Sequence, residues 1–351
     1  MTNLGTAYLS SRPMTVIGTS HRSPMRHPIV VLAFGVAALA LCAGLSLALG
    51  SRDISAPAVI DALLSRVHGR DAAVITGMRV PRTLVGMAVG AALGLAGAIV
   101  QGVTRNSLAA PTTLGINAGA ALAVVTAIYA LGLSQPGQYV WFAFAGAAAA
   151  ALFTLTLGRR AGGVDPIRLV LGGIVVQLVL ASWTSAVLLF SERTLDEARF
   201  WLVGSIAGRD LSILIPLLPA FVLGAMIGLA IAATLNTLAL GDEAAAALGV
   251  PVGRIRAAGM VAVVLLAGSA VAVAGPIAFI GLAAPHLVRL VLGSDHRVLI
   301  PGCLIAGPLL LLAADVVGRL IAPPTEVEVG IVTAFVGAPL LAVLASRRQI
   351  R

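Results

Sequence analysis

The sequence of 351 residues contains no lysine: the 23 residues counted as lysine or arginine are all arginine. A nucleotide-binding loop of the GxxxxGK[ST] kind needs its lysine to contact the β- and γ-phosphates, so this chain is not a P-loop ATPase. Cysteine is nearly absent too, and Cys42 and Cys303 both lie within apolar runs. A disulfide framework is therefore not expected.

Charged residues are also scarce. They make up 11% of the chain, whereas 59% of the residues are hydrophobic and the mean hydropathy is +1.03. A soluble domain does not need so much apolar surface, but a lipid bilayer does. The net charge of +9 would indicate a nucleic-acid partner in a soluble protein. Here most arginines fall in short loops between apolar runs, where they set membrane orientation, so we expect lipid and not nucleic acid as the partner.

The apolar runs predict an all-α integral membrane protein, since each is long enough to cross about 30 Å of hydrocarbon. Residues 1–27 are polar and read as a disordered cytoplasmic tail, and residues 28–351 form the membrane domain. Ten transmembrane helices are expected at about 28–49, 83–103, 112–133, 138–158, 168–190, 211–235, 256–274, 277–292, 298–317 and 328–345.

The loop charges predict the orientation. Arginines concentrate in the loops on the side of the N-terminus, so both termini are expected in the cytoplasm. The segment 50–82 is the exception, because it is rich in arginine and lies outside. Within it, the sequence from Ser55 onward predicts a short amphipathic helix. The exception indicates a function for the outside arginines.

An internal repeat is visible at half the length of the chain. GAALGLAG begins at Gly90 and GSAVAVAG begins at Gly268, each followed some residues later by a Leu-Ala-Ala-Pro stretch. Five predicted helices separate the two copies. Because that number is odd, the copies face opposite ways, which is the inverted repeat that many transporters contain.

One polar stretch interrupts the apolar sequence, GDEAAAALGVPVGRIR at 241–256. Asp242 and Glu243 complement the positive end of a helix dipole, and the alanines that follow favour a helix. Gly249 can adopt a left-handed cap, and Pro251 suits the first turn of the next helix. A polar helix between two hydrophobic blocks indicates a contact surface for a soluble partner.

Four stretches resemble the permease subunits of ABC importers for ferric siderophores, haem and cobalamin, the FecCD-like type II importers. They lie at 79–120 (beginning RVPRTLVGMAVGAALGLAG), 241–256, 275–297 (beginning GPIAFIGLAAPHLVRL) and 314–340 (beginning ADVVGRLIAPPTEVEVG). The resemblance implies a ten-helix permease with no resident metal or cofactor, in the inner (plasma) membrane of a bacterium. It also implies partner subunits of three kinds: a second permease that is identical or paralogous, two separate ATPases, and an external binding protein that delivers the chelate.

The resemblance also assigns roles to single residues. The helix in 241–256 resembles the coupling helix that fits a cleft in the ATPase, with contacts expected from Gly241, Asp242, Glu243, Ala246, Leu248 and Gly249. Arg79, Arg82 and Arg319 match arginines that dock the binding protein, although arginines at helix ends can also be interfacial anchors. Asn106 and Leu108 match the cytosolic gate. The partner gate loop, at 162–166, lacks the hydroxyl residues of the cobalamin importer, so ferric siderophore is the favoured cargo, then haem, then cobalamin.

The remaining polar positions within or beside apolar runs are Gln101, Asn117, Gln177, His286 and Asp315. They either line the pathway or hydrogen-bond between helices. No nucleophile–base pair, carboxylate pair or metal-ligand spacing indicates a catalytic or metal site. The alternative function is an ion-gradient-driven secondary transporter, which would have paired intramembrane acids or broken helices that face a site at the membrane midplane. A structural scaffold is a third reading, but it leaves 241–256 unexplained.

Overall fold

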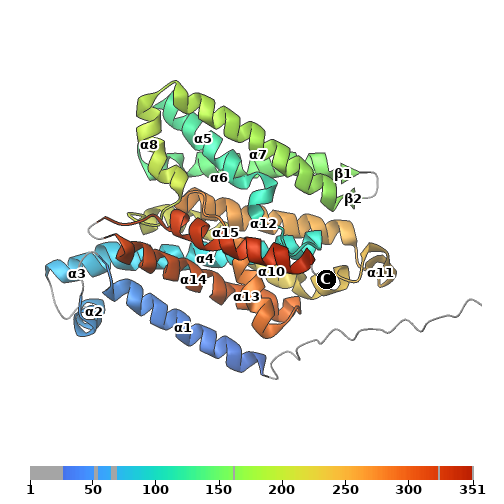
Figure 1. Ribbon diagram of the computed structural model, residues 1–351, viewed down its shortest axis with the longest axis horizontal. Helices are drawn as coiled ribbons and strands as arrows, with labels where there is room; N and C mark the ends of the chain where they lie inside the picture. The colour runs from blue at the N-terminus through green and yellow to red at the C-terminus, as the bar shows by residue number, and fades with distance from the viewer. Residues whose placement is uncertain (1–26, 51–53, 65–68, 161–162, 323–324, 350–351) are drawn as a thin grey trace, which may run out of the picture.

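The computed structural model describes residues 27–50, 54–64, 69–160, 163–322 and 325–349. The predicted tail lies outside the described residues except for His27. Figure 1 shows helices running roughly parallel along the longest axis of the molecule.

The chain is almost entirely helical. Its long helices are α1 (Pro28–Ala48), α4 (Val80–Thr104), α5 (Ile116–Leu131), α6 (Pro136–Gly158), α7 (Pro166–Leu189), α10 (Leu218–Leu238), α12 (Val252–Ala274), α13 (Ile280–Leu292), α14 (His296–Ile321) and α15 (Val329–Gln349). Its short elements are α2 (Ala56–Leu63), α3 (Arg70–Val74), the π-turn η1 (Ile75–Arg79), η2 (Pro111–Leu114), α8 (Glu192–Val203), α9 (Leu211–Leu214), η3 (Ile215–Leu217) and α11 (Asp242–Ala247). The all-α expectation missed one antiparallel pair of two-residue strands, β1 (Arg159–Arg160) and β2 (Gly163–Val164).

Every predicted span has a helix in its place, but only seven of the described helices are long and apolar enough to cross a membrane. The shorter three are α5, α13 and the described apolar part of α15. Helices α5 and α13 are short because the residue directly before each has a non-helical backbone conformation. Gly115 has a left-handed backbone (φ +76°) before α5, and Phe279 has φ +68° before α13, so helix begins later than the apolar pattern predicts.

The most enclosed helices are α4 and α12, each with 78% of its apolar window buried. They pack against each other, and α4 also packs along α13 and α14. Contact with α14 is close at two glycines: a Cβ on Gly90 would lie 2.6 Å from the Pro308 Cα, and one on Gly307 would lie 2.0 Å from the Gly90 oxygen. Small residues thus let the central helices approach closely.

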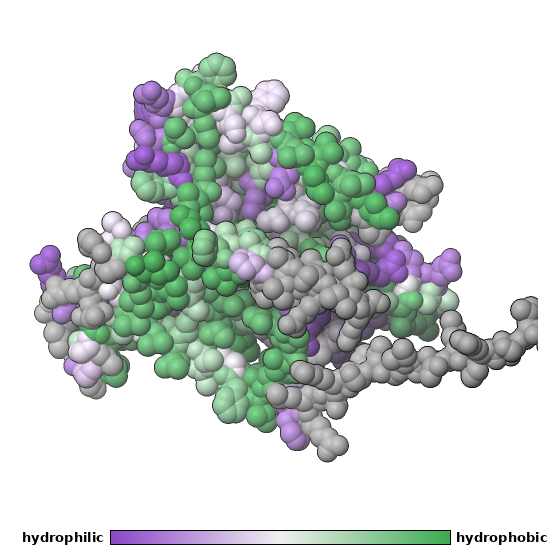
Figure 2. All heavy atoms as spheres, viewed as in Figure 1, coloured by the Kyte–Doolittle hydropathy of each residue, from purple (hydrophilic) through white to green (hydrophobic). Residues whose placement is uncertain are grey.

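The outer helices expose apolar surface. Only 11% of the α1 window and 17% of the α7 window is buried. In Figure 2, hydrophobic side chains cover the middle of the visible face and hydrophilic ones lie mainly toward its two ends. Such a band is what a bilayer requires. We name the two ends by their short helices: the α11 end also carries β1 and β2, and the α3 end also carries α2 and α8 (Figure 1).

Candidate functional site

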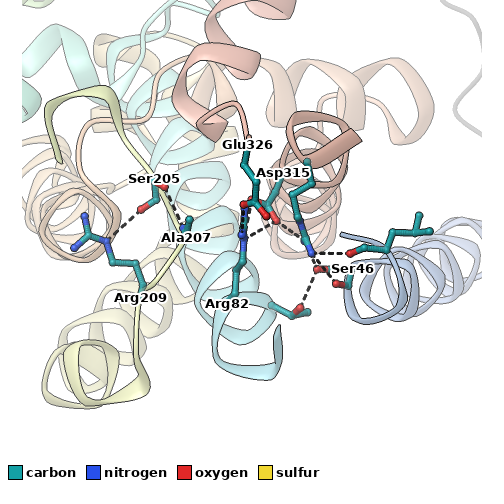
Figure 3. Close-up of polar contacts among 10 residues, drawn as sticks. Ser46, Arg82, Ser205, Ala207, Arg209, Asp315 and Glu326 are labelled. Carbon is teal, nitrogen blue, oxygen red and sulfur yellow. Dashed lines mark hydrogen bonds and ion pairs between the residues drawn. The ribbon is translucent and has the colours of Figure 1, made fainter. Parts of the chain in front are cut away.

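A buried carboxylate on α14 organises the α3 end. The side chain of Asp315 is 2% exposed and accepts hydrogen bonds from two arginines (Figure 3). Arg82 on α4 donates from Nε to both carboxylate oxygens at 3.2 Å and from Nη2 to Oδ1 at 2.7 Å. Arg319, one turn further along α14, donates from Nη2 to Oδ2. One acid therefore serves two guanidinium groups, and these bonds supply the partners that a buried charge requires.

Two arginines also hold the C-terminal end of α1. Arg319 donates from Nη1 to the carbonyl of Ser46 at 2.9 Å and that of Leu49 at 3.1 Å, and from Nη2 to the Ser46 Oγ. Arg79 donates from Nη1 to the carbonyls of Leu47 and Ala48, both at 2.7 Å. The last carbonyls of a helix have no partner within it and carry partial negative charge, so these cations satisfy and stabilise them.

The three arginines differ in exposure. Arg79 is 7% exposed and Arg319 is 3% exposed, whereas the Arg82 side chain is 13% exposed and also contacts Glu326 at 2.6 Å, beyond α14. A cavity of about 470 Å³ opens beside them, and its charged lining residues are Arg70, Arg79, Arg82, Arg209, Asp210, Arg319 and Glu326. Five arginines outnumber these two acids and the buried Asp315 that pairs with two of them, so the cavity attracts anionic groups.

The structure places the three predicted docking arginines together at one end, but sequence reasoning missed their partners. Asp315 stands out in the sequence only as a polar residue, although its spacing of four from Arg319 places both on one helix face. Arg209, which donates from Nε to the Ser205 carbonyl, and Glu326 also belong to this end. Nothing in an apolar run marks Ser46, whose hydroxyl shares a hydrogen bond with Thr83.

The helix α11 at the opposite end matches the predicted short helix. Gly241 (φ +112°) precedes it, Asp242 and Glu243 occupy its first turn, and Gly249 follows it with φ +81°. Ala245 is buried, but Ala246 and Leu248 point outward, and Leu248 is 66% exposed. Leu240, just before α11, is 68% exposed as well, so bulky apolar side chains are exposed on both sides of this helix.

The end of α10, from which the chain continues to α11, is fixed to the start of α14. Asn236, near the end of α10, donates to the Asp295 carboxylate at 2.6 Å and accepts from the backbone N–H of His296 at 2.9 Å. Hydrogen bonds from the Arg297 backbone N–H and from Asn236 lower the pKa of Asp295 below its ordinary value. These contacts join the end of α10, just before α11, to the first turn of α14.

The predicted gate residues lie in the turn that ends α4. Asn106 donates its N–H to the Gln101 carbonyl, and its side-chain oxygen accepts from the Leu108 N–H at 3.0 Å. Leu108 is partly exposed. The preceding Arg105 contacts Asp242 of α11 at 3.6 Å, and Arg256 of α12 contacts the same carboxylate at 2.9 Å. The structure therefore brings the gate turn and α11 together, which the sequence did not indicate.

The other polar positions have different settings. Gln101 is buried and accepts a hydrogen bond from Arg289 of α13, so it joins two helices. Gln177 is exposed among apolar residues of α7, where contact with lipid would be costly. Among the described residues, no group of three His, Cys, Asp or Glu side chains is placed to hold a metal ion.

Comparisons with known proteins agree on one family. The profile of the FecCD transport family matches residues 38–347. The chain is 42% identical to the ferric enterobactin transport system permease protein FepD of Escherichia coli (strain K12), over 88% of this chain and 93% of that protein. It is 38% identical to the Fe(3+)-citrate import system permease protein YfmD of Bacillus subtilis (strain 168), over 91% and 93%.

A solved structure has the same fold. It is described as an inward-facing conformation of a metal-chelate type ABC transporter, and it matches with a TM-score of 0.80 and 29% identity over 91% of this chain and 99% of that one. The chain therefore belongs to the FecCD transport family and is a permease of the iron-siderophore and cobalamin class of ABC importers.

Proposed function

We propose that this permease carries a ferric siderophore, with haem and cobalamin as the less favoured cargoes. The single observation that supports this cargo is the 42% identity to a ferric enterobactin permease over almost the whole chain. The chain is a transport component and not an enzyme. Since it lacks the P-loop lysine, the proposed assembly contains two separate ATPase subunits.

The proposed topology has all ten long helices in the membrane, with both termini and the α11 end in the cytoplasm. The arginines that follow α4, α6 and α11 support this orientation, because arginine is enriched in cytoplasmic loops. The α3 end is then outside, where its arginine-lined cavity faces the external binding protein.

We propose that α11 couples the permease to the ATPase. Its alanines allow close seating in a groove, and Leu248 supplies an exposed apolar side chain for that contact. Gly241 and Gly249 define its ends, and Asp242 and Glu243 give its first turn negative charge. The gate that responds consists of Asn106 and Leu108.

Docking of the binding protein is proposed at the cavity of the α3 end, where an acidic side chain of that partner would meet the surplus of positive charge. Arg79 and Arg319 are fixed by carbonyls of α1, so in this proposal they contribute charge and shape. Of the three predicted docking arginines, Arg82 is the one that a carboxylate can reach, in place of Glu326.

A second permease subunit is proposed to cover α7 and α15. Phe335 on α15 is 82% exposed, and the exposed face of α7 includes Trp183 together with Gln177. A protein partner would satisfy the glutamine amide, which lipid cannot do.

Reconstitution with the partner subunits tests the cargo. Proteoliposomes that contain the permease, its ATPase and trapped ATP are mixed with the binding protein and a ferric siderophore, haem or cobalamin. We expect ATP-dependent accumulation of the iron chelate, unaffected by a protonophore. Accumulation of cobalamin alone would overturn the proposed cargo, and loss of uptake with the protonophore would overturn the ATP-driven mechanism.

A further inference from the structure

A contact between Arg105 and Asp242 joins the gate turn to α11. The carboxylate of Asp242 lies 3.6 Å from Nη2 of Arg105. Since Asn106 and Leu108 follow Arg105 closely in the same turn, we propose that this ion pair transmits the movement of α11 to the gate. The inference rests on the coupling and gate roles proposed above and names the residues that connect them.

The backbone at Arg105 is unusual for an arginine. It is left-handed, with φ +52° and ψ +31°, and it directly follows the last residue of α4. The N–H of Arg105 bonds to the Gly102 carbonyl and that of Asn106 to the Gln101 carbonyl, which together form a Schellman motif. Glycine is the usual residue at this position because a side chain is strained there.

The arginine side chain has a partner that glycine could not reach. Its Nη1 lies 3.6 Å from the point where a Cβ on Gly241 would stand, so the guanidinium lies beside the residue that precedes α11. Gly241 leaves this space open, and Asp242 supplies the opposite charge. An arginine is kept at a backbone position that favours glycine, and it faces a glycine and an aspartate. This arrangement indicates that the contact with Asp242 is a function of the Arg105 side chain.

Asp242 has a second and closer partner at the same carboxylate oxygen, Oδ1. Its carboxylate accepts a hydrogen bond from Nη2 of Arg256 at 2.9 Å, and Arg256 is buried on α12. Arg105 and Asp242 are both more than a third exposed, so their own contact is screened by water and weaker. Asp242 therefore moves with α11 and α12, and Arg105 follows through the weaker contact.

The gate turn is held firmly on its far side. Gln101, whose carbonyl receives the Asn106 N–H, accepts a side-chain hydrogen bond from Arg289 of α13. The turn thus has a buried anchor at Gln101 and an exposed, breakable link at Arg105. A displacement of α11 would pivot Asn106 and Leu108 about Gln101 instead of moving all of α4.

The replacement Arg105→Gly tests this role because it removes the guanidinium and suits the left-handed backbone. It is compared with Asp242→Asn, the double variant, and Arg297→Gln as a matched control that removes one exposed charge from the same end of the molecule. Each is reconstituted with the ATPase and the binding protein, and chelate uptake per ATP hydrolysed is measured.

We expect Arg105→Gly to lower this ratio roughly two- to five-fold, the range of a partly exposed ion pair, without lowering thermal stability. The double variant should be no worse than the more severe single variant, and Arg297→Gln should match the parent. An unchanged ratio in Arg105→Gly, or multiplied losses in the double variant, would overturn the link.

A charged replacement of Leu248 separates the two proposals. If Leu248→Glu abolishes uptake while Arg105→Gly has no effect, α11 couples by another route and the link is wrong. If Leu248→Glu also leaves uptake unchanged, the coupling role of α11 itself fails.

Discussion

Replacement of Asp315 by asparagine should destabilise the permease strongly. The native carboxylate compensates two guanidinium groups, on α4 and α14. The introduced amide would keep one acceptor oxygen for Arg82, but its –NH₂ would be a second donor facing Arg319. Arg82 retains Glu326, whereas Arg319 is 3% exposed and would keep only neutral acceptors in α1.

The expected loss follows from this asymmetry. Removal of one partner from a buried ion pair costs about 3–5 kcal/mol, because the other charge stays buried and uncompensated. The neutral acceptors left to Arg319 place D315N near the lower end of that range, at about 3 kcal/mol. The unfolding midpoint should fall by roughly 5–10 °C.

The assay heats the purified permease in detergent and follows the folded fraction by size-exclusion chromatography. D196N is the control, since Asp196 and Arg199 form an exposed pair on α8 whose loss should cost no more than about 0.5 kcal/mol. A second change, R319M, should restore part of the stability of D315N because it removes the uncompensated charge. If D315N melts with the parent, or the two losses simply add, the coupling between Asp315 and Arg319 is refuted.

Three other predictions concern separate parts of the molecule. Leu248→Glu should abolish ATP-driven uptake without reducing the amount of permease in the membrane. The control is Leu195→Glu, a change of another exposed leucine, on α8, which should leave uptake unchanged. Equal uptake by the two variants would contradict the role of α11. Arg82→Gln, which leaves Asp315 paired with Arg319, should weaken binding-protein association most at low salt, measured by surface plasmon resonance at two ionic strengths, because salt screens the lost attraction; a salt-independent affinity change would count against docking there. Gly90→Val should lower the free energy of unfolding by about 1–3 kcal/mol, since its Cβ would strike Pro308. Gly253→Ala, with open space around it, should stabilise α12 by about 0.5–1 kcal/mol. Thermal melting checks both, and an unchanged melting temperature in Gly90→Val would refute the close contact of α4 with α14.

The sequence predicts the helices well because length and apolarity decide them. Each expected span contains a helix, and the amphipathic segment after Ser55 is α2. The errors lie where local backbone conformation intervenes. Phe279 at φ +68° delays α13, and the arginine-rich segment before α4 is a continuous helical path through α3 and η1. Neither follows from apolar periodicity.

The sequence predicts which arginines form the site at the α3 end, but not which residues they contact. Arg79, Arg82 and Arg319 stand out in the sequence because arginine is unusual on the side predicted to be outside, but their shared partners in α1 and α14 depend on tertiary packing. Ser46 illustrates the limit, since a serine in an apolar helix carries no mark of the arginine 273 residues away that it binds. The choice between an ATP-driven importer and an ion-gradient transporter followed from the family and not from composition.

The capping of α1 by Arg319 has a consequence for the order of assembly. Helix α1 leaves the ribosome well before α14, yet the carbonyls of Ser46 and Leu49 gain Arg319 as a partner only when α14 has been synthesised. Until then this end of α1 has its contacts with α4 and η1, among them the Arg79 hydrogen bonds and the Ser46–Thr83 hydrogen bond. The Arg319 hydrogen bonds at the end of α1 therefore form only after α14 has inserted. A chain truncated before α14 would lack them, and the carbonyls of Ser46 and Leu49 would stay without this partner.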